Sequence, residues 1–144
     1  MRGFFILLAF ILVIFSFGCS QDESSGEPQE KSINLASQNI IGDASTGKRL
    51  YIYCQACHTL KSGGAHKVGP NLFGFINSAA AEKDGFVFSE ALIQSELVWT
   101  DDVLDQWMIS PSKLVPGNNM VFAGINDPQQ RADLIAYLNE ATKE

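Results

Sequence analysis

Cys54-Gln55-Ala56-Cys57-His58 forms a C-x-x-C-H pattern, through which c-type proteins bind haem covalently. The spacing has a physical reason, because two thiols three positions apart on a helical turn can both reach the vinyl groups at one edge of a porphyrin. The next residue then directs its imidazole at the iron. The pattern predicts one covalent haem c, with Cys54 and Cys57 as attachment points and His58 as an axial iron ligand.

Two other chemistries use paired cysteines, and the sequence favours neither. A thioredoxin-like dithiol sits near a βαβ unit, and we find no such frame here. A structural zinc site needs further Cys or His ligands, and apart from the motif the chain has only Cys19 and His66 to offer. Haem attachment is therefore the favoured interpretation.

The second axial ligand has three candidates, Met108, Met120 and His66. Met108 lies in residues 101–109, whose apolar spacing is helical, and a core methionine explains it. Met120 lies in the turn-rich residues 115–124, which can present a thioether to a metal. His66 lies in a Gly-rich loop that would have to wrap around the haem edge to reach the iron, so we expect it to be solvated. Met120 is the predicted ligand.

Two segments carry the signs of helices that frame this site. Residues 47–53 run into the cysteines with the apolar spacing of an amphipathic helix. Near the C-terminus, Asp127 can cap a helix, Pro128 suits its first position and Gln130 can close a capping box. We expect an all-α domain of three to five helices whose loops enclose one covalently bound haem.

Residues 1–19 are predicted to be an export signal or an N-terminal membrane anchor. One cation, Arg2, precedes an apolar run that ends at Gly18-Cys19 and is short for a membrane span, which needs about 20 apolar residues. The small residue before Cys19 resembles a bacterial lipobox, which favours lipidation of Cys19. An uncleaved helical anchor and cleavage elsewhere stay open. We expect a protein anchored to the membrane on its periplasmic, extracytoplasmic face.

The rest of the chain divides into a linker and one folded domain. Residues 20–41 are polar and of mixed charge, which predicts a flexible tether with a reach on the order of 25 Å. Residues 42–144 are the predicted domain, and from Asp43 onward they contain eight Lys/Arg against twelve Asp/Glu. An acidic domain lacks the basic field that attracts nucleic acid, so we expect no nucleic-acid partner.

From Gly42 to the C-terminus the chain resembles class I cytochromes c, the mitochondrial and bacterial c2-like family. The resemblance rests on the C-x-x-C-H motif and on four further segments, Val68-Gly69-Pro70-Asn71-Leu72, Val115-Pro116-Gly117 with Met120, Phe122-Ala123-Gly124-Ile125, and residues 131–138. It implies thioethers at Cys54 and Cys57 and axial ligation by His58 and Met120. It also implies that the Pro70 carbonyl accepts a hydrogen bond from His58 and that Trp99 donates to a haem propionate.

The resemblance also implies a helix crossing and a less polar pocket than in many relatives. Gly47 and Tyr51 match residues that cross Leu134 and Tyr137 in the family. Asn77-Ser78 stands where many relatives have Gly-Arg near the propionates. Phe88 and Leu92 replace a tyrosine and an asparagine beside the haem, and Trp107 replaces a tyrosine that bonds the methionine sulfur. The indole N–H of Trp107 could take over that bond.

The lysine ring that surrounds the exposed haem edge in mitochondrial relatives is sparse here. Five cations could still form a basic patch on that face, namely Lys48, Arg49, Lys61, Lys67 and Lys113. A membrane tether offers another explanation, because confinement near the partners raises their effective concentration and relaxes the need for electrostatic steering.

These features predict an electron carrier rather than an enzyme. With His58 on one side and Met120 on the other, the iron has no open position for a substrate. We expect a monomer that shuttles one electron from a cytochrome bc1-type quinol-oxidising complex to a terminal oxidase or a photosynthetic reaction centre. Two alternatives stay open: a gas sensor or peroxidase in which Met120 detaches readily, and a fixed subunit of a larger respiratory enzyme.

Overall fold

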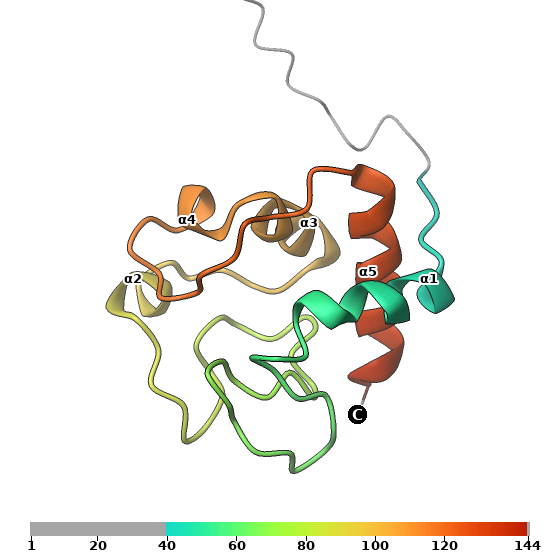
Figure 1. Cartoon of the computed structure of the whole chain (residues 1–144). Coiled ribbons are helices and arrows are strands. Elements are labelled where there is room, and N and C mark those ends of the chain that lie inside the picture. Colours follow the sequence, from blue (N-terminus) through green and yellow to red (C-terminus); the bar gives the residue numbers. More distant parts are fainter. Residues whose placement is uncertain (1–39, 144) are drawn as a thin grey trace, which may run out of the picture. The chain divides into compact units, whose positions relative to one another are not determined.

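A computed structural model describes residues 40–143 of the chain. Within this range the chain forms five α-helices and one 3-10 helix (Figure 1): α1 (Ala44–Leu50), η2 (Tyr51–Tyr53), α2 (Glu90–Ile93), α3 (Asp101–Ile109), α4 (Pro111–Leu114) and α5 (Pro128–Ala141). The only β pairing described is an isolated antiparallel bridge between Ala79 and Val98. The expected all-α architecture is therefore confirmed for this part of the chain.

Helix α1 crosses α5, and this crossing holds the two ends of the domain together (Figure 1). A side chain at Gly47 would bring its Cβ within 1.9 Å of the Asp133 carbonyl oxygen, so only glycine allows the helices to approach this closely. One turn further along, the rings of Tyr51 and Tyr137 pack with their centroids 5.7 Å apart. Leu134 is fully buried in the same hydrophobic cluster as Tyr51.

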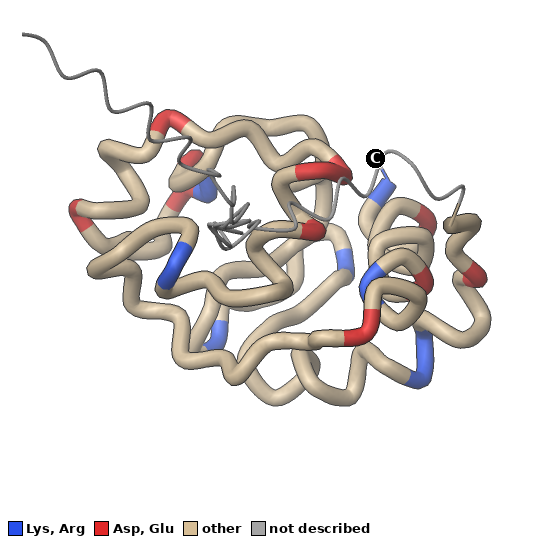
Figure 2. Tube along the Cα trace, turned by 90° about the horizontal axis from the view of Figure 1, so that it is seen from above, with Lys and Arg blue, Asp and Glu red and all other residues tan. Residues whose placement is uncertain are grey.

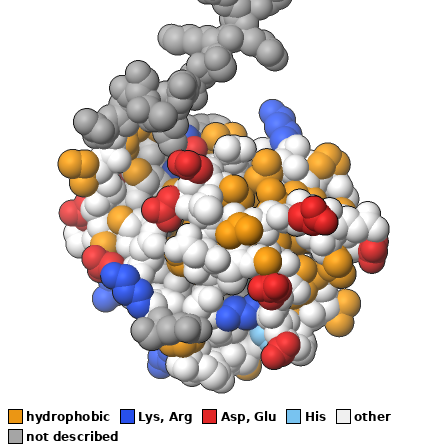
Figure 3. All heavy atoms as spheres, turned by 180° about the vertical axis from the view of Figure 1, so that it is seen from behind, with side chains coloured by type: hydrophobic (Ala, Val, Ile, Leu, Met, Phe, Trp, Pro, Cys, Tyr) orange, Lys and Arg blue, Asp and Glu red, His pale blue; other side chains and the backbone are white. Residues whose placement is uncertain are grey.

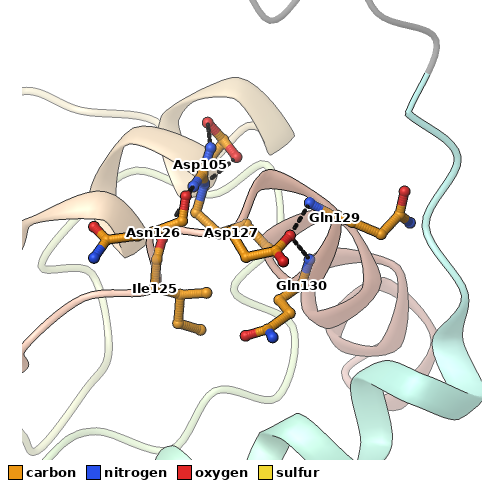
Figure 4. Close-up of polar contacts among 7 residues, drawn as sticks. Asp105, Ile125, Asn126, Asp127, Gln129 and Gln130 are labelled. Atoms are coloured by element: carbon orange, nitrogen blue, oxygen red, sulfur yellow. Dashed lines mark hydrogen bonds and ion pairs between the residues drawn. The ribbon is translucent and has the colours of Figure 1, made fainter.

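Asp residues cap both of these helices. The Asp43 carboxylate accepts a hydrogen bond from the Thr46 N–H at 2.6 Å, and its own N–H donates to the Asp133 carboxylate on α5. At the start of α5, Asp127 accepts from the N–H groups of Gln129 and Gln130 at 2.8 and 3.2 Å (Figure 4). The Gln130 side chain points away from Asp127 (Figure 4), so the expected capping box does not form.

A buried ion pair joins α3, α5 and the chain segment between α4 and α5. The Arg131 Nε lies 2.7 Å from Asp105 Oδ1, and both side chains are almost completely buried. The same guanidinium donates through Nη1 to the carbonyl oxygens of Ile125 and Asn126 at 3.0 and 2.9 Å (Figure 4). Arg131 therefore fixes the end of the segment that carries Met120.

The residues before the domain lie outside the described part of the chain. This applies to the predicted signal or anchor at 1–19, to Cys19, and to nearly all of the predicted tether at 20–41. Among the described residues, no helix has the length and the apolar character that crossing a membrane requires.

Three residues other than glycine adopt a left-handed backbone within two positions of the bridge of Ala79 and Val98. The φ angles of Asn77, Ala81 and Glu96 are 61°, 64° and 52°. Asparagine tolerates this conformation, but at alanine the Cβ approaches the following carbonyl oxygen at a cost of roughly 1–2 kcal/mol. Ala81 therefore stores local strain.

Replacing Ala81 by glycine should stabilise the protein. The relief of strain exceeds the extra entropy that glycine gives the unfolded chain, so Ala81→Gly should raise the free energy of unfolding by about 1 kcal/mol. Denaturant titration of the haem-loaded protein would measure the change. Ala80→Gly is the matched control, because Ala80 has no positive φ, and it should lower stability. Equal losses in both variants would contradict the assignment of strain to Ala81.

Candidate functional site

The described residues surround a cavity of about 350 Å³, within the range of about 300–1,000 Å³ typical of ligand pockets. Its wall contains all nine residues that were predicted to attach the haem, bind its iron or support its pocket: Cys54, Cys57, His58, Pro70, Phe88, Leu92, Trp99, Trp107 and Met120. The predicted lipidation site, Cys19, lies outside the described residues. Segments distant in sequence thus meet around one mostly apolar cavity.

Two clusters of buried side chains border the cavity, and Trp99 packs against both. The larger cluster includes Leu104, Met108 and Leu134, and the smaller one consists of Leu92, Trp107 and Val115. Except for Val115, all of these side chains also line the cavity. A group bound in the cavity would therefore contact both clusters and complete the core.

Cys54 and Cys57 present two free thiols to the cavity from a single turn. The turn closes through the Cys57 N–H, which donates to the Cys54 carbonyl at 3.0 Å, directly after η2. Burial, followed by the proximity of Cys57, raises the pKa of Cys54 to about 11. Until a ligand bonds to it, the Cys54 side chain is therefore a neutral thiol at physiological pH, in a position to react with a group that fills the cavity.

His58 is held in one orientation and one tautomer. Its Nδ1 lies 2.8 Å from the Pro70 carbonyl oxygen, and because a carbonyl only accepts, Nδ1 carries the proton and donates it. Burial lowers the pKa of His58, which keeps the ring neutral and leaves the Nε2 lone pair free. A Cβ at Gly69 would come within 2.3 Å of the ring, so glycine is required beside it. A neutral, oriented imidazole of this kind suits metal ligation.

Met120 is held at two points. The indole N–H of Trp107 donates to the Met120 sulfur, with Nε1 and Sδ 3.2 Å apart, so the indole does provide the bond that the sequence left open. The Met120 backbone N–H donates to Asn118 Oδ1 at 2.8 Å. The amide nitrogen of Asn118 donates in turn to the carbonyls of Pro111 and Val115. Sequence reasoning missed Asn118, because its role depends on the shape of the turn.

The two rival ligands are placed differently. Met108 also lines the cavity, but it is buried in the core cluster with Leu104 and Ile125. His66 is not among the residues that line the cavity, and both of its ring nitrogens are engaged. Its Nδ1 accepts from the Asn71 N–H at 2.9 Å, and its Nε2 donates to the Asp84 carbonyl at 2.8 Å. His66 thus connects two loops.

Aromatic and aliphatic side chains form the remaining wall. The rings of Trp99 and Trp107 pack edge to face at 5.1 Å, and Phe88 packs against Phe86 at 4.8 Å. Leu92 is 9% exposed. The Ser78 hydroxyl donates to the Phe75 carbonyl at 2.7 Å. The pocket therefore has the low polarity that its sequence predicts.

Comparisons with known proteins show which family the chain belongs to. Residues 44–142 match the family model described as Cytochrome c. The chain belongs to the cytochrome c family. The cytochrome c of Chlamydomonas reinhardtii is 41% identical over 102 residues, which cover 70% of this chain and 91% of that protein. The cytochrome c of Theileria parva is 43% identical over 104 residues, covering 72% and 90%.

A solved structure gives the same result. Cytochrome cH from Methylobacterium extorquens has a TM-score of 0.65 and 44% sequence identity, with 69% of this chain and 99% of that chain covered. As a cytochrome c of the class I, mitochondrial type, the protein is an electron carrier rather than an enzyme, and the Cys54, Cys57 and His58 motif implies one covalent haem c. The paired thiols, the free Nε2 of His58 and the apolar cavity fit that group.

Tyr51 connects the site with the crossing of α1 and α5, and its ionisation should lower the stability of the protein at high pH. Its hydroxyl donates to the His58 carbonyl at 3.0 Å, and burial is the main cause that raises the pKa of Tyr51 to about 12, against about 10 in an unfolded chain. The stabilisation of the neutral phenol is thus complete below pH 10 and is lost as pH rises toward 12.

Tyr51→Phe should therefore lower stability near neutral pH but flatten its decline above pH 10. Denaturant titration of the haem-loaded protein at pH 8 and about pH 11 would test this. Tyr53→Phe is the control, because Tyr53 is 60% exposed and should leave the pH profile unchanged. An equally steep alkaline decline in Tyr51→Phe and the natural protein would refute the assignment.

Proposed function

We propose that this cytochrome c holds its haem iron between His58 and Met120 and carries single electrons from a quinol-oxidising complex of the cytochrome bc1 type to a terminal oxidase or a photosynthetic reaction centre. The main support is the fixation of Met120 in the wall of the cavity that His58 also lines. Trp107 holds the sulfur and Asn118 holds the backbone of the same residue. A methionine that is held at its sulfur and at its backbone is preorganised to bind a metal.

The residues around the cavity favour electron transfer over bond-making chemistry. Two protein ligands leave the iron no position for a substrate, so the bound haem supplies one-electron oxidation and reduction only. The thioether favours the reduced state, and the apolar wall of Leu92, Phe88 and the two tryptophans penalises the extra positive charge of the oxidised state. Both effects raise the reduction potential.

The N-terminal sequence supports a place at a membrane. The apolar run within residues 1–19, the lipobox-like Gly18-Cys19 and the polar residues 20–41 suggest a monomeric domain tethered on the periplasmic face. A tether of this length lets the domain turn between two complexes in the same membrane. Lipidation of Cys19 is part of this proposal, and mass spectrometry of the mature protein would detect it.

A redox titration followed by exposure to carbon monoxide tests the proposed ligation. The full-length protein, extracted from membranes with detergent, should have a high reduction potential and should not bind carbon monoxide when reduced, because Met120 occupies the sixth position. A low potential or prompt carbon monoxide binding would reject Met120 as a firm ligand and favour a gas sensor or a peroxidase. Failure to exchange electrons with any purified quinol-oxidising or terminal complex would reject the carrier role proposed here.

Asn118 and Asn119 offer a matched pair for testing how Met120 is held. Asn118→Ala removes the acceptor for the Met120 N–H and the donors to two carbonyls, so it should loosen the loop and let the reduced protein bind carbon monoxide, which the natural protein is expected to exclude. Asn119→Ala should behave like the natural protein, because Asn119 is exposed. Stopped-flow spectroscopy would compare them, and identical rates would exclude the proposed role of Asn118.

A further inference from the structure

The haem c that the motif implies brings two carboxylates to a mostly apolar cavity. Two of its pyrrole rings carry the groups that bond Cys54 and Cys57, and the other two carry propionates, which are ionised near neutral pH. A carboxylate that leaves water loses solvation, and this loss is costly unless hydrogen-bond donors or a cation compensate for it. The wall of the cavity should therefore contain partners for the propionates.

Lys83 is the only lysine or arginine that lines the cavity among the described residues. None of the five cations predicted for a basic patch at the haem edge belongs to this wall. Lys83 is also half-buried, and it differs in this from the other described lysines, which are exposed: Lys48, Lys61, Lys67, Lys113 and Lys143.

Cations elsewhere on the domain do not offer a substitute. Along the trace, Lys and Arg occur at separate points and alternate with Asp and Glu (Figure 2). On the face drawn in Figure 3, both signs are likewise scattered between hydrophobic side chains. The only ion pair between described residues joins Arg131 to Asp105, so Arg131 is engaged and no carboxylate of this part of the chain pairs with Lys83.

The position of Lys83 is fixed, although most of its donors are unused. Its ammonium group donates to the Phe73 carbonyl, which takes one of three N–H groups. The Lys83 carbonyl accepts from the Phe86 N–H at 3.3 Å, so the backbone is held as well. Two N–H groups of the ammonium are left for an acceptor in the cavity.

Neutral donors of the wall can orient a carboxylate, but they do not neutralise it. Ser89 Oγ accepts from the Leu92 N–H at 3.3 Å, which leaves the hydroxyl hydrogen to donate. The indole of Trp99, which is expected to donate to a propionate, carries no charge. A charge opposite to that of the propionates comes only from Lys83 within the described wall.

We propose that the Lys83 ammonium, held at the Phe73 carbonyl, is the counter-ion of one haem propionate. The inference goes beyond the proposed function, because it concerns how the chain binds its haem and does not depend on the partner complexes. An ionised propionate near the iron favours the oxidised state, so its neutralisation by Lys83 raises the reduction potential. The same ammonium stabilises the carboxylate and lowers the pKa of the propionate.

Other titratable groups near this position bear on the test. Glu82 and Tyr53 also line the cavity, and both are exposed, so water and salt screen a charge at either side chain. Asp84 and His66 do not line the cavity, and His66 Nε2 donates to the Asp84 carbonyl at 2.8 Å. All four groups are retained in the variants below, so a difference between variants reports the charge at Lys83.

Lys83→Gln removes the charge and keeps a side chain that can donate a hydrogen bond. At about pH 8 it should lower the equilibrium constant for haem reduction roughly tenfold, which is about 59 mV for a one-electron couple. The loss should shrink toward about pH 5, because the propionate without its cation has a pKa raised by about one unit or more and takes up a proton instead. Redox titration of the full-length, haem-loaded protein across this pH range would measure both effects.

Two variants and the natural protein serve as controls. Lys113→Gln removes the same charge at an exposed side chain that does not line the cavity, and it should leave the potential nearly unchanged at each pH. Lys83→Arg keeps the charge and should retain most of the natural potential. In the natural protein, infrared spectroscopy should find at least one propionate that stays ionised down to about pH 4.

Four outcomes would overturn the proposal. They are equal potentials in Lys83→Gln and Lys113→Gln, a loss in Lys83→Arg as large as in Lys83→Gln, and protonation of both propionates of the natural protein above about pH 5. The fourth is a lower stability of Lys83→Gln with an unchanged potential, because Lys83 would then only tie its loop to Phe73.

The carbon monoxide experiment separates these failures from failure of the proposed function. If Met120 does not bind the iron, carbon monoxide binds to every variant and all potentials are low. The difference between Lys83→Gln and Lys113→Gln still reports the propionate in that case, because it does not depend on the sixth ligand.

Discussion

The hydrogen bond from His58 Nδ1 to the Pro70 carbonyl fixes the chemistry of the cavity. It decides which ring nitrogen is protonated and therefore which one carries the free lone pair. It also restricts the residue before Pro70, because Gly69 must lack a side chain for the His58 ring to fit. The next peptide group continues the arrangement, since the Asn71 N–H donates to His66 and the Asn71 side chain donates to Thr59 and to the Lys61 carbonyl. A single imidazole orientation thus depends on a whole loop.

Loops rather than helices form most of the cavity wall, so the shape of the site depends on what holds the loops as much as on helix packing. Hydrogen bonds from polar groups inside the loops hold them. His66 and Lys83 connect the loop after the cysteines with residues 82–88, Asn118 closes the turn before Met120, and Arg131 holds the backbone after it. Hydrogen bonds of this kind contribute about 1 kcal/mol each, but losing one also releases the geometry of a ligand. Small polar changes should therefore affect redox properties more than overall stability.

Local features could be predicted from the sequence, whereas features that depend on residues far apart in the chain could not. The Cys54–His58 motif and the caps at Asp127 and Pro128 follow from adjacent residues, and the all-α fold follows from periodicity and family resemblance. The pairing of Arg131 with Asp105, the bond from Trp107 to Met120 and the role of Asn118 each need the folded chain. The lining of the cavity also needs the folded chain, because a count of cations along the sequence does not show that none of the five candidates lines it.

The cavity between the two buried clusters has a consequence for the life of the protein in the cell. Among the described residues, Trp99 packs against both clusters, and a prosthetic group that fills the cavity would join them across the rest of the space between them and complete the core. Covalent attachment then acts as a maturation checkpoint. We expect a chain that misses it to be more open to proteolysis, so the cell should accumulate mainly chains that hold the group.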